Sequence, residues 1–209
     1  MPCARRHATV SCIALLLAFC APLRALASDY RIDAVHSQIF FSASHDGYTN
    51  PSGRMHVKNG TFRFDEADWT KSQVDATIDI ASLDMGDAPW NSKLLTGYFD
   101  AHTYPTARFV STRVEKTGEK TGVIHGNLTL LGRTKPVDLQ VTFNRAAFNG
   151  YTLRYVAGFS ATAAFKRSAF GMDRETKSVG DDVSVHMEIE GVRDGDAKPQ
   201  ADAAPKSGP

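Results

Sequence analysis

Cysteine is almost absent from this sequence of 209 residues, and its three cysteines lie near the N-terminus, at Cys3, Cys12 and Cys20. The rest of the chain therefore forms no disulfide, even in an oxidising compartment, and its fold must be stabilised by a packed core alone. An excess of either charge is also missing, because 24 basic residues face 23 acidic ones. This balance excludes the basic surface that a nucleic-acid or anionic-lipid partner would need.

A long apolar segment is missing as well. The run "VSCIALLLAF" has about ten residues, roughly half of what a membrane-spanning helix needs. It follows a basic stretch at Arg5 to His7 and precedes Ala25-Leu26-Ala27, the order typical of a secretory signal with a small-residue cleavage site. We therefore expect residues 1–27 to be removed on export to the periplasm, so that the mature protein starts at Ser28 without a membrane anchor. Lipid attachment at Cys20 is the alternative, and the bulky residue before this cysteine disfavours it.

Apolar periodicity is absent from the C-terminal end. The segment from Asp194 to Pro209, "DGDAKPQADAAPKSGP", is rich in Ala, Pro, Asp and Lys. Such a composition cannot bury enough apolar surface to offset the entropy lost on ordering. We predict a disordered tail over residues 194–209, which leaves residues 28–193 as one domain of ordinary size.

Within this domain, apolar residues alternate with polar ones at a period of two, which predicts β-strands. The stretch "GNLTLLGRTKPVDLQVTF", Gly126 to Phe143, is interpreted as two strands joined by a tight turn. The stretch "GRMHVKNGTFRFD" is interpreted as a second hairpin that turns at Asn59-Gly60. About eight or nine strands with short connections predict an antiparallel sandwich or barrel.

One stretch, "DAPWNSKLLTGYFD", breaks the alternation. Pro89 suits an early position of a helix and Gly97 suits its end. Trp90, Leu94 and Phe99 would then lie along one side. We predict a short helix laid against or across the sheet.

Catalytic and metal-binding signatures are missing. The sequence has no HExxH, no CxxCH and no phosphate-binding glycine loop, and its histidines are scattered. "GFSAT", Gly158 to Thr162, resembles a nucleophile elbow only in part, because the second glycine is replaced and no helix follows. Asp100 and His102 are close enough in sequence for an acid–base pair, but they precede Tyr104-Pro105 in a turn and lack a third partner. We predict no catalytic residue, no metal site and no cofactor.

Several short motifs follow one another along the domain. The clearest runs from Leu128-Thr129-Leu130 through Gly132 to Thr134-Lys135-Pro136-Val137. The others, in chain order, are Asp33, His36, Ser37 and Phe41; Ser82-Leu83-Asp84; Phe99-Asp100, Tyr104-Pro105 and Phe109; and Arg167-Ser168 with Phe170-Gly171-Met172. Together they resemble the YceI-like family of exported, lipocalin-like proteins over residues 29–192. Met85, where a threonine is usual, and Trp90-Asn91-Ser92-Lys93, in place of a more acidic helix start, depart from that pattern.

The resemblance implies an all-β fold, an extended eight-stranded antiparallel lipocalin-like β-barrel with a short inserted helix. It also implies that the lumen holds a long apolar ligand, such as a polyisoprenoid, an isoprenoid quinone or a fatty-acid-like lipid. From the residues alone, a barrel of this size is either filled by side chains or holds one small ligand. The small inward residues leave a cavity only if they face one another: Ala43, Ala76, Gly126, Ala161 and Ala163.

The predicted ligand-binding residues are the inward-facing ones of the strands, the helix and the late loop. They are Ile39, Phe41, Ala43, Phe62, Phe64, Ile78, Ile80, Trp90, Leu94, Phe99, Phe109, Leu128, Leu130, Phe159, Ala161, Ala163, Phe165, Phe170, Met172 and Met187. Arg167, Arg174 and Lys177 are interpreted either as contacts for a phosphate head group or as solvated loop charges.

Three functions are consistent with these features. The first is a periplasmic carrier of an isoprenoid-like lipid, and the second is a scavenger of diverse hydrophobic or toxic compounds. The third is a structural barrel that recognises a protein partner. We expect a hydrophobic small molecule as ligand, with no nucleic-acid partner and no catalysis, and the sequence leaves a homodimer open.

Overall fold

The computed structural model describes residues 27–195. The predicted signal peptide, apart from Ala27, and the predicted tail, apart from Asp194 and Gly195, lie outside the described residues. The described part consists of nine strands, one α-helix and two short 3-10 helices. The strands are β1 (Ser28–Ile32), β2 (Gln38–His45), β3 (Ser52–Phe64), β4 (Gln73–Asp84), β5 (Thr106–Lys116), β6 (Thr121–Leu130), β7 (Arg133–Asn149), β8 (Arg154–Lys166) and β9 (Val179–Arg193). The helices are η1 (Trp69–Lys71), α1 (Ala88–Gly97) and η2 (Arg167–Phe170).

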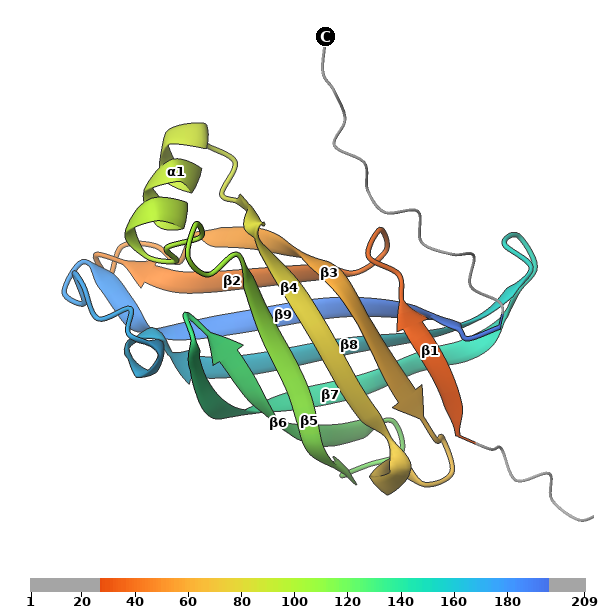
Figure 1. Ribbon diagram of the computed structural model, residues 1–209. Coiled ribbons are helices and arrows are strands. Elements are labelled where there is room, and N and C mark those ends of the chain that lie inside the picture. The colour runs from red at the N-terminus through yellow and green to blue at the C-terminus, as the bar shows by residue number, and fades with distance from the viewer. Residues whose placement is uncertain (1–26, 196–209) are drawn as a thin grey trace, which may run out of the picture.

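All strand pairs are antiparallel, and the sheet closes on itself into a barrel (Figure 1). β3 pairs with β4, and β2 joins β3 to β9, which closes a ring through β8, β7, β6 and β5. β1 also lies between β3 and β9, so β1 and β2 follow one another in a single position of this ring. Nine strands therefore fill eight positions, which confirms the predicted eight-stranded, lipocalin-like barrel.

The break between β1 and β2 is held by two polar residues. The carboxylate of Asp33 accepts hydrogen bonds from the amides of Val35 and His36, and it also contacts His36 Nδ1 at 2.9 Å. Ser37 is fully buried, and its hydroxyl bridges both the amide and the carbonyl of Glu190 on β9. These bonds replace the strand pairing that is interrupted between β1 and β2. Because of them, the chain can pass from the end of β1 to the start of β2 without leaving buried backbone groups unpaired.

The predicted hairpin at Asn59-Gly60 is wrong, because β3 runs through this dipeptide as one continuous strand. The pairing of β3 with β4 is irregular between Val57 and Asn59, which marks a β-bulge. A Cβ atom on Gly60 would lie 2.7 Å from Ile32 Cδ1 and 2.9 Å from the carbonyl oxygen of Asp75. The glycine is therefore required by the close approach of β1 and β4 and not by a turn.

The hairpin predicted over Gly126 to Phe143 is confirmed. β6 and β7 are joined by Leu131 and Gly132, whose φ angles are 49° and 68°. Two successive positive φ angles are those of a type I′ turn, which matches the twist of the flanking strands. The hydroxyls of Thr129 and Thr134 are 2.8 Å apart next to the turn.

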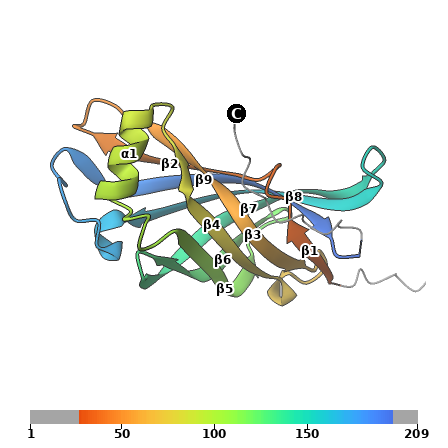
Figure 2. The ribbon, with the colours of Figure 1, turned by 45° about the horizontal axis from the view of Figure 1, so that its top comes forward.

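The predicted short helix is also confirmed, as α1. The side chain of Asp87 caps it by accepting a hydrogen bond from the amide of Trp90, and Pro89 lies in its first turn. None of its residues is buried, so it is held by contacts along one side only. α1 lies over the barrel end where the β2–β3 and β8–β9 connections also lie, whereas the β7–β8 hairpin extends from the opposite end (Figures 1 and 2). No helix within residues 27–195 is long and apolar enough to cross a membrane.

The inward side chains form two adjoining clusters along the barrel axis. The cluster under α1 includes Met55, Ile80, Phe109, Leu130 and Met172. The second cluster, toward the opposite end, is rich in aromatic rings: Tyr30, Phe62, Phe64, Trp69 and Phe143, with Phe159 packed against them. The barrel is thus filled differently in its two halves.

Candidate functional site

An apolar cavity of about 260 Å³ lies in the half of the barrel under α1. All nine strands contribute to its wall, and α1 covers part of it through Trp90 and Leu94. An apolar cavity of about 150 Å³ is already large enough to stay dry and bind benzene. The space is therefore suited to an apolar molecule rather than to water.

Small residues on facing strands create this space. Of the small residues that the sequence analysis placed inward, Ala43, Ala76 and Ala163 line the cavity, as does Ala107, whereas Ala161 lies in the packed half. Gly126, which the sequence also placed among them, adds no room because the ring of Phe109 occupies the position of its missing side chain.

Most of the predicted ligand-binding residues line the cavity. They are Ile39, Phe41, Ala43, Ile78, Ile80, Trp90, Leu94, Phe99, Phe109, Leu128, Leu130, Ala163, Phe165, Met172 and Met187. The structure thus brings together residues from six strands, α1 and the connections that follow α1 and β8. Whether each contacts a ligand stays a prediction.

Five predicted residues do not line the cavity. Phe62, Phe64, Phe159 and Ala161 face inward, but they belong to the packed aromatic half of the barrel. Phe170 is buried in η2, where its ring packs edge-on against Phe165 at a centroid distance of 5.3 Å. Alternation along a strand identifies the inward face, but it does not tell how deep along the barrel each residue lies.

Several lining residues were missed by the sequence analysis. Those on strands share the inward alternation, which already placed some of them, such as Ala76, on the inward face without naming them as ligand-binding residues: Ile32, Met55, Val57, Val74, Ala76, Ala107, Val137, Leu139, Val183, Val185 and Ile189. Ser44, Pro51, Met85, Tyr98 and Val179 lie at the helix end of the barrel and carry no such signal. His45 lies there too and continues the alternation of Phe41 and Ala43, and Arg167 was considered only as a head-group contact or a solvated charge.

All four methionines of the described residues line the cavity: Met55, Met85, Met172 and Met187. A methionine side chain is unbranched and polarisable, so it adapts its shape to an irregular neighbour. Met85, which departs from the family pattern, lies here beside Phe41. This wall can fit around apolar molecules of different outline.

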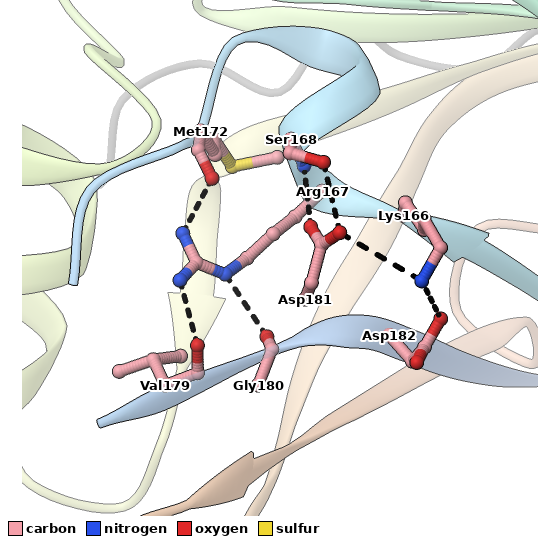
Figure 3. Close-up of polar contacts among 8 residues, drawn as sticks. All are labelled: Lys166, Arg167, Ser168, Met172, Val179, Gly180, Asp181 and Asp182. Atoms are coloured by element: carbon pink, nitrogen blue, oxygen red, sulfur yellow. Dashed lines mark hydrogen bonds and ion pairs between the residues drawn. The ribbon is translucent and has the colours of Figure 1, made fainter. Parts of the chain in front are cut away.

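Arg167 lies in the cavity wall, and it is not one of the solvated loop charges that one interpretation of the sequence took it to be. It is only 3% exposed. Its guanidinium donates to the carbonyl oxygens of Met172, Val179 and Gly180 at 2.5–3.0 Å (Figure 3). It also donates to the carbonyl oxygen of Arg174 at 2.8 Å. These bonds use most of its N–H donors, so Arg167 holds the β8–β9 connection in shape rather than facing a ligand phosphate.

Ser168 and Asp181 fix the same connection from the other side (Figure 3). The carboxylate of Asp181 accepts hydrogen bonds from the amide and the hydroxyl of Ser168, both at 2.9 Å. These bonds lower the pKa of Asp181 below its usual value, so it stays charged. Lys166 pairs with the neighbouring Asp182 at 2.9 Å. The Arg167-Ser168 motif thus has a structural role in tying η2 to β9.

The candidate catalytic groups do not form a catalytic arrangement. Ser160 lies within strand β8 and not at a strand-to-helix turn, and its hydroxyl donates to Glu188 at 2.7 Å. Glu188 in turn pairs with His186 at 2.9 Å, so a carboxylate and not an imidazole faces the serine. Asp100 and His102 lie in a tight turn, in which the carbonyl of Asp100 accepts hydrogen bonds from the amides of Thr103 and Tyr104, and the His102 side chain is exposed. Within residues 27–195, no group of three or more potential ligands is placed to hold a metal ion.

An eight-position antiparallel barrel with an apolar cavity under a short helix defines a lipocalin-like protein. Within that class, residues 30–191 match the family model of the YceI-like domain. The chain therefore belongs to the YceI-like family, as its motifs predicted.

Relatives and solved structures agree with this assignment. The chain is 37% identical over 176 residues to a UPF0312 protein of Photorhabdus laumondii, covering 81% of this chain and 89% of the relative. It is similar in structure to BcnA of Burkholderia cenocepacia, with a TM-score of 0.67 and 26% identity over 76% of this chain and 98% of BcnA. A polyisoprenoid binding domain from Saccharophagus degradans shares the fold, with a TM-score of 0.60 at 17% identity over 78% of this chain and 98% of that domain.

Proposed function

We propose that this protein binds a long apolar ligand in the cavity under α1 and carries it in the periplasm. The observation that supports this most directly is the cavity itself, which is walled by apolar side chains from every strand. A soluble barrel whose core were meant only for stability would be filled, since protein interiors are normally packed to crystal density.

The ligand class follows from the chemistry of the wall. Apart from Ser44, His45, Trp90, Tyr98 and Arg167, the lining side chains are hydrocarbon or thioether. Each methylene that enters such a wall contributes ~0.8 kcal/mol, so a chain needs no charged anchor to bind tightly. A polyisoprenoid, an isoprenoid quinone or a fatty-acid-like lipid meets this requirement, and a polyisoprenoid is the ligand named for the S. degradans domain that shares the fold.

The proposed compartment rests on the N-terminal sequence, where a basic stretch, a short apolar run and Ala25-Leu26-Ala27 follow one another. We expect the exported protein to begin at Ser28 without an acyl group. Intact-mass measurement of protein from a periplasmic fraction tests this. A species that starts at Cys20 and is heavier by a lipid would contradict it.

The binding function is tested by mass spectrometry of an organic extract from freshly purified, full-length exported protein. We expect one dominant apolar compound at a molar ratio near that of the protein. A matched extract of the Ala163→Trp variant, whose cavity is filled, should contain much less of it. Equal amounts in both extracts, or no apolar compound in either, would reject the proposal.

A second function is favoured by one observation, the methionine lining. Met55, Met85, Met172 and Met187 give the wall an adaptability that a single ligand would not require. A scavenger of diverse hydrophobic compounds would use it. The same extract separates the two functions, because a scavenger should yield a mixture of compounds of different classes.

A further inference from the structure

On the side away from α1, the cavity is lined by Ile32, Val57, Val74 and Ile189, which pack against a cluster of aromatic rings that does not itself line the cavity. Phe159 lies at the centre of this cluster. Its ring meets those of Phe62, Phe64 and Phe143 at centroid distances of 5.4, 5.0 and 5.4 Å. Two of these contacts are edge-to-face, which is a favourable geometry for aromatic pairs. Trp69 extends the cluster, with its ring 5.6 Å from that of Phe64.

The boundary between cavity and cluster can be followed along β8 and β3, whereas on β4 and β9 the lining residues Val74 and Ile189 lie opposite Phe62 and Phe159. On β8, Ala163 lines the cavity, Ala161 is already buried in the packed half, and Phe159 belongs to the aromatic cluster. On β3, Val57 is the last residue of the strand that lines the cavity, and Phe62 and Phe64 lie beyond it. On β8 the change takes place between Ala163 and Ala161, one inward repeat of roughly 7 Å, whereas on β3 several positions separate Val57 from Phe62.

We propose that Phe62, Phe64, Phe143 and Phe159 form a floor that sets the length of the chain which the cavity accepts. This inference rests on the proposed binding function and adds the specificity of that site. An apolar chain enters from the α1 end and stops at the floor. A ligand longer than the cavity keeps its polar end and its remaining carbons outside, next to Ser44 and His45.

Phe159 is the residue of the floor whose substitution should deepen the cavity. Its neighbours in the cluster are buried, whereas Phe159 is only half-buried and touches three of them. Phe159 also pairs across the sheet with Ile189, which lines the cavity, so removing its ring leaves space next to the cavity wall, and cores collapse only in part around such a loss. A chain should then reach about two to three methylenes deeper.

The test uses straight-chain primary alcohols that lengthen by one methylene at a time, titrated into delipidated full-length exported protein. For the wild type, Kd should fall about fourfold per methylene and then stop falling at a definite chain length. In Phe159→Ala, this break should move to longer chains, and in Phe159→Leu it should move by less. Phe148→Ala, which removes an exposed phenylalanine from the far hairpin, is the matched control and should keep the wild-type break.

The possible outcomes distinguish a failure of the proposed floor from a failure of the proposed binding function. A break at the same chain length in wild type and both Phe159 variants would overturn the floor while leaving the binding function intact. Affinity that keeps rising with every added methylene in the wild type would also overturn it. Failure of the wild type to bind any alcohol would instead reject the proposed function. If Phe159→Ala does not fold, as judged by thermal unfolding, the smaller change in Phe159→Leu still decides the question.

Discussion

The hydroxyl of Tyr98 donates a hydrogen bond of 2.5 Å to the carboxylate of Glu175. Tyr98 directly follows α1, and Glu175 lies in the β8–β9 connection, so the bond joins the two segments that cover the same end of the barrel. Burial raises the pKa of Tyr98, and the hydrogen bond lowers the pKa of Glu175, so the donor stays protonated and the acceptor charged at neutral pH. The Tyr98 ring also lies 5.6 Å from the guanidinium of Arg167.

Tyr98→Phe removes only this hydroxyl and keeps the ring over Arg167. Because this bond joins the two segments that cover the end of the barrel, its loss should speed ligand release roughly 2- to 10-fold. Stopped-flow release of a bound alcohol measures the rate. Tyr151→Phe, which removes an exposed hydroxyl at the opposite end of the barrel, is the matched control. Equal release rates for Tyr98→Phe and wild type would show that the hydrogen bond between Tyr98 and Glu175 does not limit the opening of this end of the barrel.

Arg167→Ala should destabilise the protein strongly. It leaves the buried carbonyl of Met172 and the part-buried carbonyls of Arg174, Val179 and Gly180 without their donor, and a buried acceptor without a partner costs about 1–3 kcal/mol. We expect the free energy of unfolding, measured with urea, to fall by on the order of 3 kcal/mol or more. Arg174→Ala is the matched control, since this side chain is exposed and its carbonyl contact is kept. A small loss in Arg167→Ala, similar to that of the control, would contradict the role given to Arg167.

The pair formed by Asp33 and His36 predicts a pH dependence of stability. The hydrogen bond to Asp33 raises the pKa of His36 above its usual value of 6.5. Burial alone would raise the pKa of Asp33, but hydrogen bonds from His36 and two amides outweigh it and lower this pKa below 3.8. The charged imidazole therefore stabilises the fold below about pH 6.5, and this contribution is lost as the pH rises through the raised pKa. The carboxylate contributes above 3.8 and loses its effect as the pH falls below that value.

His36→Gln removes this dependence. The difference in melting temperature between wild type and variant should be larger at about pH 5.5 than at about pH 8.5, because only the lower pH charges the imidazole. His102→Gln, at an exposed turn position, serves as control and should show no such trend. A difference that is equal at both pH values would mean that the pair contributes nothing through its charge.

Ala163 and Ala161 lie on the same face of β8 but in different surroundings, which gives a matched pair of variants. Ala163 lines the cavity, so a tryptophan there should fill it, reduce ligand binding at least tenfold and leave the melting temperature nearly unchanged. Ala161 is buried in the packed half, so a tryptophan there should overpack the core at a cost of about 1–3 kcal/mol or more. Titration and thermal unfolding of both variants check this. Similar losses of stability in the two variants would argue against a cavity beside Ala163.

Local sequence signals predicted those parts of the fold that local physics determines. The alternation of apolar residues gave the inward faces, Leu131-Gly132 lies in the turn of a predicted hairpin, and Pro89 and Gly97 marked the two ends of α1. Asn59-Gly60 led to a wrong hairpin prediction because the preference of this dipeptide for turns is a local property. In the structure, a glycine is needed at position 60 because β1 and β4, which come from elsewhere in the chain, approach its backbone closely. A tertiary contact outweighed the turn propensity.

The sequence predicted which kinds of residue point into the barrel, but not how far along the barrel axis each of them lies. Alternation placed Phe159 and Ala163 on one face, yet it could not show that the first belongs to a packed cluster and the second to a cavity wall. That distinction depends on which rings meet across the barrel, and such pairs are far apart in sequence. Arg167 was misjudged for a similar reason, because a loop arginine reveals its burial only when the carbonyls around it are in place.

Trp90 allows the access route to be tested directly. Its side chain lines the cavity from α1, and its ring lies 6.4 Å from that of His45 at the same end of the barrel. α1 has no buried residue to anchor it, as expected of an element that moves to admit a ligand. The other tryptophan of the chain, Trp69, is buried in the aromatic half, so a Trp69→Phe background isolates the Trp90 signal.

In that background, the emission of Trp90 should change on reloading stripped protein with an isoprenoid alcohol, and the change should saturate together with binding measured by calorimetry. Trp90→Ala should accelerate both loading and release, because it removes the largest side chain with which α1 covers the cavity. Leu153→Ala, at the exposed tip of the far hairpin, is the control and should leave both rates unchanged. If the emission stays constant through saturation and Trp90→Ala loads and releases at the wild-type rates, the ligand enters by a route that does not pass α1.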